Sequence, residues 1–200
     1  MRTTLSLLWL LAVGTGFAMF LNYQNTGGSS GATSAQLPAG SRLVQTSGRD
    51  TLVMFAHPRC PCTRTSIDEL NRLMARVSDH VNAQVWFYQP ANAATAWSKT
   101  SSWFSAAAIS GVTVHEDPDG AQARLFGAET SGTMLLYDSH GNLLFKGGIT
   151  GSRGHAGDNP GEDAIASLCL GQATGTNQTP VFGCSLFGKC DSVAAAGGAK

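Results

Sequence analysis

The chain has 200 residues, a length that favours one folded domain with extensions. Its 13 basic residues balance its 13 acidic residues, so the formal net charge is zero and no basic surface typical of nucleic-acid binding is indicated. No long run of like charge is present, which also argues against a polybasic membrane-surface segment. We therefore expect no nucleic-acid partner.

The chain begins with an apolar segment, residues 5–21, which carries no charge. This length is at the short end for a helix that crosses a hydrocarbon core of ~30 Å. Arg2 precedes the segment and the next basic residue is Arg42, so the positive-inside rule keeps the N-terminus in the cytoplasm. A cleaved signal peptide shares these features and is the alternative. We expect an anchor or uncleaved signal at 1–23, which makes the protein a single-pass protein of the cell membrane, facing the periplasm or the extracellular side.

Composition divides the remaining chain into a linker, a domain and a tail. Residues 24–40 are uncharged and rich in Gly, Ser, Thr and Ala, which predicts a flexible linker. We expect the folded domain at 41–171. The C-terminal tail at 172–200 carries Cys184 and Cys190.

Hydrophobic patterns predict alternating strands and helices within the domain. The final helix has a clear beginning, because Asn159 is a good N-cap and Pro160 suits the first helical position. The predicted order is β-α-β-α-β-α-β-β-α, which is mixed α/β. The elements expected are a strand at 51–56, a helix that follows the cysteine pair, a strand at 83–88, a helix at 97–109, a strand at 112–114, a short helix at 121–126, hairpin strands at 133–137 and 143–145, and a helix at 160–170.

The first strand leads directly into the sequence HPRCPC at 57–62, which contains two cysteines. Pro61 is favoured at the first position of a helix, so Cys60 is expected as the N-cap and Cys62 within the first turn. The unpaired N–H groups and the dipole at a helix N-terminus stabilise a thiolate and lower the pKa of a cysteine there. This arrangement is typical of a reactive thiol.

Neighbouring residues modify this prediction. Arg59 and Arg64 add positive charge near the two sulfurs. A capping box at 66–69 competes for the helix start and would leave both cysteines in a loop. His57 either tunes the thiols or ends the strand, and the sequence supports both interpretations equally.

The chain resembles the thioredoxin superfamily over about 51–171. The resemblance lies in the strand–cysteine–helix unit at 51–77 and in the pattern GTMLLYDSHGNLLFKGG at 132–148. The segments HPRCPC, GGITGSRGHAGDN and TPVFGC resemble the RedB-like, membrane-anchored thioredoxin-fold proteins. The resemblance implies a four-stranded mixed sheet flanked by helices, preceded here by one N-terminal transmembrane helix.

The implied fold places the loop at 147–159 on the side of the cysteine pair, which brings Arg153 and His155 near Cys60. Two departures from the thioredoxin pattern stand out. The cysteines are separated by one residue, where thioredoxins have two. The region at 131–133 reads Ser-Gly-Thr, where thioredoxins carry a cis-proline, so substrate docking beside that proline is not carried over.

Structural disulfides are the main alternative for exported cysteines. A bridge between Cys60 and Cys62 would be strained because the sulfurs are so close in sequence, which disfavours a purely structural role. Cys184 and Cys190 either form a tail disulfide or stay apart. Cys169 is expected as a small core residue of the last helix. Five cysteines cannot all pair within one chain.

The favoured function is a membrane-tethered thiol–disulfide oxidoreductase without metal or cofactor. Its partners would be exported protein thiols or disulfides, or a redox partner protein. A strained Cys-x-Cys bridge is relatively oxidising, which favours disulfide donation or isomerisation over reduction. The catalytic residues expected are Cys60 and Cys62, and the supporting residues expected are His57, Pro61, Arg153, His155 and Cys184.

The alternative function is binding and delivery of copper, because two thiolates suit the soft cation Cu(I). Its expected ligands are Cys60, Cys62 and His155, with His57 or Cys184 as other candidates for the third position. A degenerate thioredoxin domain that only binds partners is a third possibility, which the intact thiol pair disfavours.

Overall fold

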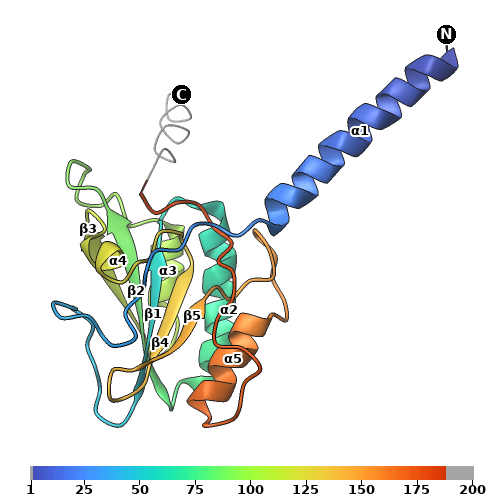
Figure 1. Ribbon diagram of the computed structural model, residues 1–200. Coiled ribbons are helices and arrows are strands. Elements are labelled where there is room, and N and C mark those ends of the chain that lie inside the picture. The colour runs from blue at the N-terminus through green and yellow to red at the C-terminus, as the bar shows by residue number, and fades with distance from the viewer. Residues whose placement is uncertain (1, 188–200) are drawn as a thin grey trace.

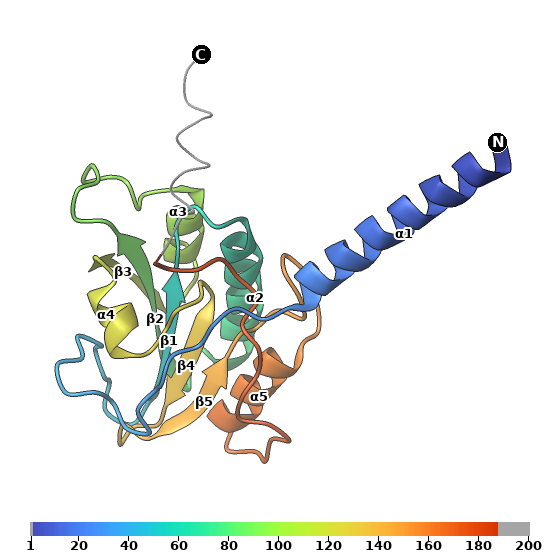
Figure 2. The same ribbon diagram turned by 45° about the horizontal axis from the view of Figure 1, so that its top comes forward.

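The computed structural model describes residues 2–187, beginning with a single long helix, α1 (Arg2–Asn25). This helix has 24 residues and is exposed along its length. It projects away from the domain in both views (Figure 1, Figure 2). By length and composition it is able to cross a membrane once, which is compatible with a single anchor.

The domain is built on one mixed sheet with the strand order β3-β2-β1-β4-β5. The neighbours β1–β2 and β2–β3 run parallel, whereas β1–β4 and β4–β5 run antiparallel. The strands are β1 (Asp50–Ala56), β2 (Val81–Gln89), β3 (Val112–Pro118), β4 (Thr133–Tyr137) and β5 (Leu143–Gly147).

The sheet has five strands, where the thioredoxin resemblance implied four. The additional edge strand is β3, which pairs with β2 from Ala83↔Val112 to Gln89↔Pro118. The sequence predicted this strand only over 112–114, because the polar residues that follow carry no strand pattern. Pairing with a long neighbour extends β3 beyond the part that its own pattern indicates.

The two faces of the sheet carry separate cores, which alternate residues of β1 divide between them. On one face, Leu52 and Met54 pack with α2 (Pro61–Val77), α3 (Ser101–Ala107) and α5 (Pro160–Cys169). On the other face, β1 packs with the short helix α4 (Ala121–Leu125), Phe126 and Leu186 through its residues Val53 and Phe55. The mixed sheet flanked by helices is the predicted fold class, and it is confirmed.

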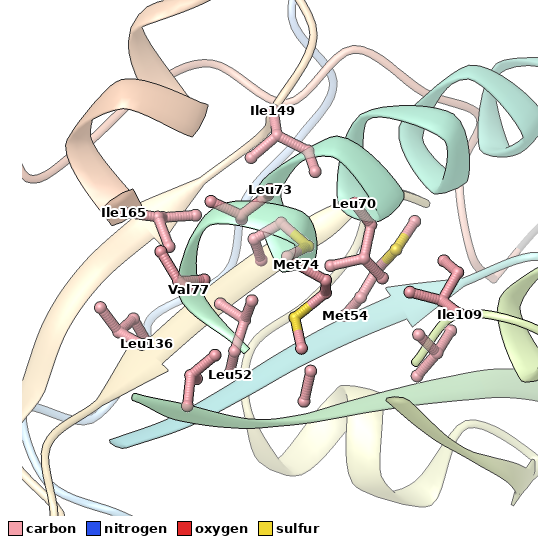
Figure 3. Packing of buried hydrophobic residues seen from close by; sticks show 14 of the residues in the cluster. Leu52, Met54, Leu70, Leu73, Met74, Val77, Ile109, Leu136, Ile149 and Ile165 are labelled. Atoms are coloured by element: carbon pink, nitrogen blue, oxygen red, sulfur yellow. The ribbon is translucent and has the colours of Figure 1, made fainter. Parts of the chain in front are cut away.

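Helix α2 is fixed on the sheet by a row of buried apolar side chains. Leu70, Leu73, Met74 and Val77 lie over the strands, in one cluster with Ile165 of α5 (Figure 3). All four have at most 2% of their surface exposed. This packing holds the first turn of α2 at the end of β1, where the cysteine pair lies.

The helix predicted at 97–109 is shorter in the structure, and its predicted start is wrong. Gln89 holds the preceding residues in a turn, because its side chain donates to Ala94 O at 3.2 Å and accepts the Ser98 N–H at 3.0 Å. The N-cap of α3 is Thr100. Trp97 therefore lies before the helix, since a glutamine from a neighbouring strand satisfies the backbone of this turn.

Residues 24–40, predicted as a flexible linker, lie along the domain in the structure. Gly28 N–H donates to Val181 O, and Leu143 N–H donates to Ala35 O, both at 2.8 Å. These bonds use the backbone alone. Composition gives no sign of them, because any residue of the segment could supply the same groups.

The C-terminal tail also packs against the domain over its described part. Val181, Phe182 and Leu186 are buried, and Leu186 N–H donates to Glu129 O at 2.8 Å. In both views the tail, coloured red, crosses the end of the sheet where β1 leads into α2 (Figure 1, Figure 2). The tail thereby brings residues distant in sequence to the cysteine pair.

The predicted cap of α5 is confirmed, since the Asn159 side chain accepts the Glu162 N–H at 2.9 Å. We expect Asn159→Ala to lower the free energy of unfolding by about 1 kcal/mol, because a helix N–H loses its acceptor. Chemical denaturation of the full chain in detergent measures this change. Asn177→Ala is the control, because Asn177 is exposed and its side chain makes no hydrogen bond within residues 2–187. Equal losses from the two variants would contradict the capping role.

Candidate active site

The helix start predicted from Pro61 is confirmed. Helix α2 begins at Pro61, and Cys60 is its N-cap, with extended backbone angles of φ −82° and ψ 123°. The competing capping box at 66–69 does not start the helix. Ser66 lies within it, and its hydroxyl donates to Cys62 O at 3.3 Å. Proline prevails here because its fixed φ suits a first helical residue, which also needs no N–H.

Three cysteines meet at this helix end. The Cys60 side chain is buried, and its Sγ accepts the Cys184 backbone N–H at 3.4 Å. The pKa of Cys60 is lowered, first by a hydrogen bond with the Cys184 thiol and next by one with the Cys62 thiol. The Cys184 backbone N–H and the Thr63 hydroxyl contribute further, and burial acts in the opposite direction. These hydrogen bonds favour the thiolate form of Cys60.

Cys62 has the opposite character. Its pKa is raised, first because its thiol hydrogen-bonds to Cys60, then by burial and by the negative charge of Cys60. The positive charge of Arg153 and the backbone of Gly154 act in the opposite direction. The sequence left open which cysteine is the nucleophile. The opposite pKa shifts of the two thiols favour the thiolate at Cys60 and the thiol at Cys62.

Arg153 lies at the site and connects it to the end of α1. Its Nε donates to Tyr23 O and its Nη2 to Thr26 O, each at 3.2 Å. Its Nη1 donates to the carbonyl of Gly183, the residue before Cys184. The guanidinium also lies over the Tyr23 ring, 4.7 Å from the centroid. One arginine side chain therefore binds both the segment that follows α1 and the tail. Its positive charge also acts on Cys62.

His57 lies in an aromatic cluster beneath the site. Its ring stacks on Tyr88 at 5.8 Å and meets the edge of Trp97 at 5.6 Å between centroids. Its Nδ1 accepts the Arg59 N–H at 3.2 Å, and its carbonyl accepts the Cys60 N–H at 3.2 Å. His57 thus shapes the turn that leads into Cys60.

Two polar residues of the site were missed by the sequence analysis. Ser131 Oγ accepts the His57 N–H at 2.8 Å and lies 2.7 Å from Thr63 Oγ1. The Ser131 N–H donates to the Cys184 carbonyl at 2.8 Å. Ser131 therefore joins the end of β1, the first turn of α2 and the tail. No local pattern marks it, because its partners lie far away in sequence.

Within residues 2–187, no hydrogen bond joins His155 or Cys169 to the three cysteines of the site. His155 is exposed, and its backbone N–H donates to Ser152 O at 3.3 Å. Within residues 2–187 no group of three or more His, Cys, Asp or Glu side chains is arranged to hold a metal ion. Cys169 packs in the core of α5, and burial raises its pKa to about 12. The tail disulfide between Cys184 and Cys190, one of the two alternatives for these cysteines, involves a residue outside the described part of the chain.

The pKa assignments predict a distinct pH dependence of alkylation. A free thiol loses reactivity about tenfold per pH unit below its pKa of ~8.5, because only the thiolate reacts. The pKa of Cys60 is lowered, so its alkylation by iodoacetamide should stay constant between about pH 6 and pH 9. Mass spectrometry of the labelled full chain assigns the rate to each cysteine, and Cys60→Ser removes the pH-independent phase. A rate at Cys60 that rises like that of a free thiol would refute the assignment.

The proteins similar to this chain were found by comparing structures, so the similarity concerns the fold. No family model and no curated protein matches the sequence. A hypothetical protein from Sinorhizobium meliloti matches with a TM-score of 0.60 at 20% identity, over 82% of this chain and 96% of that chain. An uncharacterized conserved protein from Geobacillus kaustophilus matches with a TM-score of 0.59 at 18% identity, over 83% and 94%.

A putative thiol:disulfide interchange protein DsbE from Chlorobium tepidum has a TM-score of 0.46 at 20% identity, over 73% of this chain and 96% of that chain. Identities this low concern the fold alone. The order of the strands and the cysteine pair at the start of α2 agree with the resemblance found in the sequence. The chain has a thioredoxin-like fold.

Proposed function

We propose that the protein is a membrane-tethered, extracytoplasmic thiol–disulfide oxidoreductase that acts through Cys60. The observation that carries the proposal is the hydrogen bonding of Cys60 Sγ to a backbone N–H and to two other thiols. Such an environment favours the thiolate, which is the nucleophile in thiol–disulfide exchange. A cleft of about 330 Å³, lined in part by Arg59, Cys60 and Arg64, lies at the site.

The reaction needs one nucleophilic thiolate and one resolving thiol. The Cys60 thiolate attacks one sulfur of a substrate disulfide, forming a mixed disulfide and releasing the other substrate sulfur as a thiolate. A second cysteine, for which the motif suggests Cys62, then gives up its proton to solvent and attacks Cys60 Sγ. The second substrate thiolate leaves. Two electrons have passed to the substrate, and the reverse sequence donates a disulfide.

Ring strain bears on the direction of the reaction. A bridge between Cys60 and Cys62 encloses only Pro61, so reduction relieves strain. Stabilisation of the Cys60 thiolate also favours the reduced form, as a low pKa does in strong disulfide donors. Both effects support disulfide donation or isomerisation of exported proteins. The RedB-like resemblance agrees with a membrane-anchored protein of this kind.

Replacement of Cys60 tests the function. In a disulfide-exchange assay on the full chain in detergent, Cys60→Ser should reduce turnover to the uncatalysed rate, because no thiolate remains to attack. Cys169→Ala is the matched control and should keep the parent rate, since Cys169 lies in the core. Parental turnover in Cys60→Ser would eliminate the proposal. The copper alternative would replace it if the reduced protein lacked turnover and bound one Cu(I), with loss of binding on replacement of Cys60 and Cys62.

The membrane topology is tested separately. Arg2 lies before the apolar part of α1, and no basic residue follows until Arg42, which supports an exported domain. Alkaline phosphatase fused after Gly40 should therefore be active, because that enzyme matures only outside the cytoplasm. Green fluorescent protein at the same position serves as the opposite reporter. Fluorescence without phosphatase activity would reverse the orientation and the redox environment with it.

A further inference from the structure

Cys184 lies at the active site on a segment that is far from Cys60 in sequence. The two residues are 124 positions apart, yet the Cys184 N–H donates to Cys60 Sγ at 3.4 Å. Their thiols also interact, and this contact makes the largest contribution to the lowered pKa of Cys60. A third sulfur therefore lies in hydrogen-bonding contact with the proposed nucleophile.

The tail is held on both sides of Cys184. The Cys184 carbonyl accepts the Ser131 N–H at 2.8 Å, and the preceding carbonyl of Gly183 accepts from Arg153. Downstream, Ser185 forms an antiparallel bridge with Thr130. These contacts fix the backbone of Cys184 beside Cys60 and leave its side chain half-buried. The thiol is thus both positioned and accessible.

We propose that Cys184 is a third redox-active cysteine of this site and that it resolves the mixed disulfide formed at Cys60. The disulfide that the oxidised protein keeps is then Cys60–Cys184. This inference rests on the proposed exchange function and identifies a catalytic residue for it.

Backbone geometry favours this bridge over the one within the motif. A Cys60–Cys62 bond closes a small ring around Pro61, whose φ is fixed and which begins α2. A bond from Cys60 to Cys184 joins separate segments and is free of that ring constraint. It also closes a far longer loop of the unfolded chain, which makes a disulfide more stabilising. Cys62 then serves as a hydrogen-bond donor to the Cys60 thiolate.

The chemical step balances without any further reactant. A substrate disulfide, the oxidant, first forms a mixed disulfide with Cys60. The Cys184 thiol loses its proton to solvent, and its sulfur attacks Cys60 Sγ. The bond between Cys60 and the substrate breaks, and the substrate sulfur leaves as a thiolate. Two electrons pass from the two cysteines to the substrate, and a dithiol reductant or a substrate dithiol reverses the step.

Disulfide mapping tests the proposal directly. The full chain in detergent, with Cys169→Ala and Cys190→Ala, is oxidised with one equivalent of diamide, blocked with N-ethylmaleimide and digested with trypsin. Residues 60–64 form one peptide and residues 154–189 another. We expect these two peptides cross-linked, with N-ethylmaleimide on Cys62. A Cys60–Cys62 bridge as the only product would overturn the proposal.

Two substitutions separate the thiol from the placement of the tail. Cys184→Ser keeps a hydrogen-bond donor for Cys60 but should lower turnover about tenfold or more and accumulate the Cys60–substrate mixed disulfide, because the resolving step is lost. Gly183→Ala should reduce the yield of the cross-linked peptide, since a Cβ there would lie 2.0 Å from the Ser131 carbonyl oxygen. Gly175→Ala is the matched control, because no atom lies within 4 Å of its Cβ.

The outcomes separate the role of Cys184 from the proposed exchange function. Full turnover in Cys184→Ser, together with loss of turnover in Cys60→Ser, would overturn the role of Cys184 and leave the exchange function standing. Full turnover in Cys60→Ser would remove both. Circular dichroism and thiolate absorbance near 240 nm show whether Cys184→Ser is folded with an intact Cys60 thiolate. If Cys184→Ser is misfolded or lacks the Cys60 thiolate, the role of Cys184 is decided by two other results. These are the cross-linked peptide from the protein that keeps Cys60, Cys62 and Cys184, and the lower yield of that peptide in Gly183→Ala.

Discussion

Stabilising a thiolate on a buried side chain is the constraint on which this site depends. Only 3% of the surface of Cys60 is exposed, and a buried charge is costly unless hydrogen bonds replace the water that it loses. The donors come from different parts of the chain: a backbone N–H and a thiol of the tail, and a thiol in the first turn of α2. The site therefore exists only when the sheet, the helix and the tail are assembled together.

Ser131 contributes to that assembly through neutral groups. It accepts from the backbone at the end of β1, contacts Thr63 in α2 and donates to the tail at Cys184. Each bond is of ordinary strength, worth about 1 kcal/mol net. Their joint effect is positional, because three separate segments share one hydroxyl and one amide. Ser131 and Thr63 thus help to fix the positions of the sulfur atoms.

Local signals in the sequence predicted most elements of the fold and the start of the active-site helix. Pro61 and Asn159 act through backbone geometry and capping within a few residues, so their effects are readable from the chain alone. The length of β3 and the late start of α3 depend on partners in other elements, namely β2 and the Gln89 side chain. The roles of Thr63 and Ser131 were unpredictable for the same reason. Cys184 was named from the segment TPVFGC and as a candidate third ligand for Cu(I), but its contact with Cys60 could not be read from the sequence.

Arg153 adds a coupling between the redox site and the N-terminal helix. It binds the carbonyls of Tyr23 and Thr26 at the end of α1, and it also binds Gly183 and acts on the charge balance of Cys62. The three bonds use the three nitrogens of the guanidinium, which spreads its donors over a plane, whereas a lysine ammonium would present its donors from a single atom. The segment that follows α1 and the tail that carries Cys184 both bind this one side chain. A displacement of either segment would therefore move the side chain and disturb its bonds to the other. This connection holds the thiol cluster beside the C-terminal end of α1.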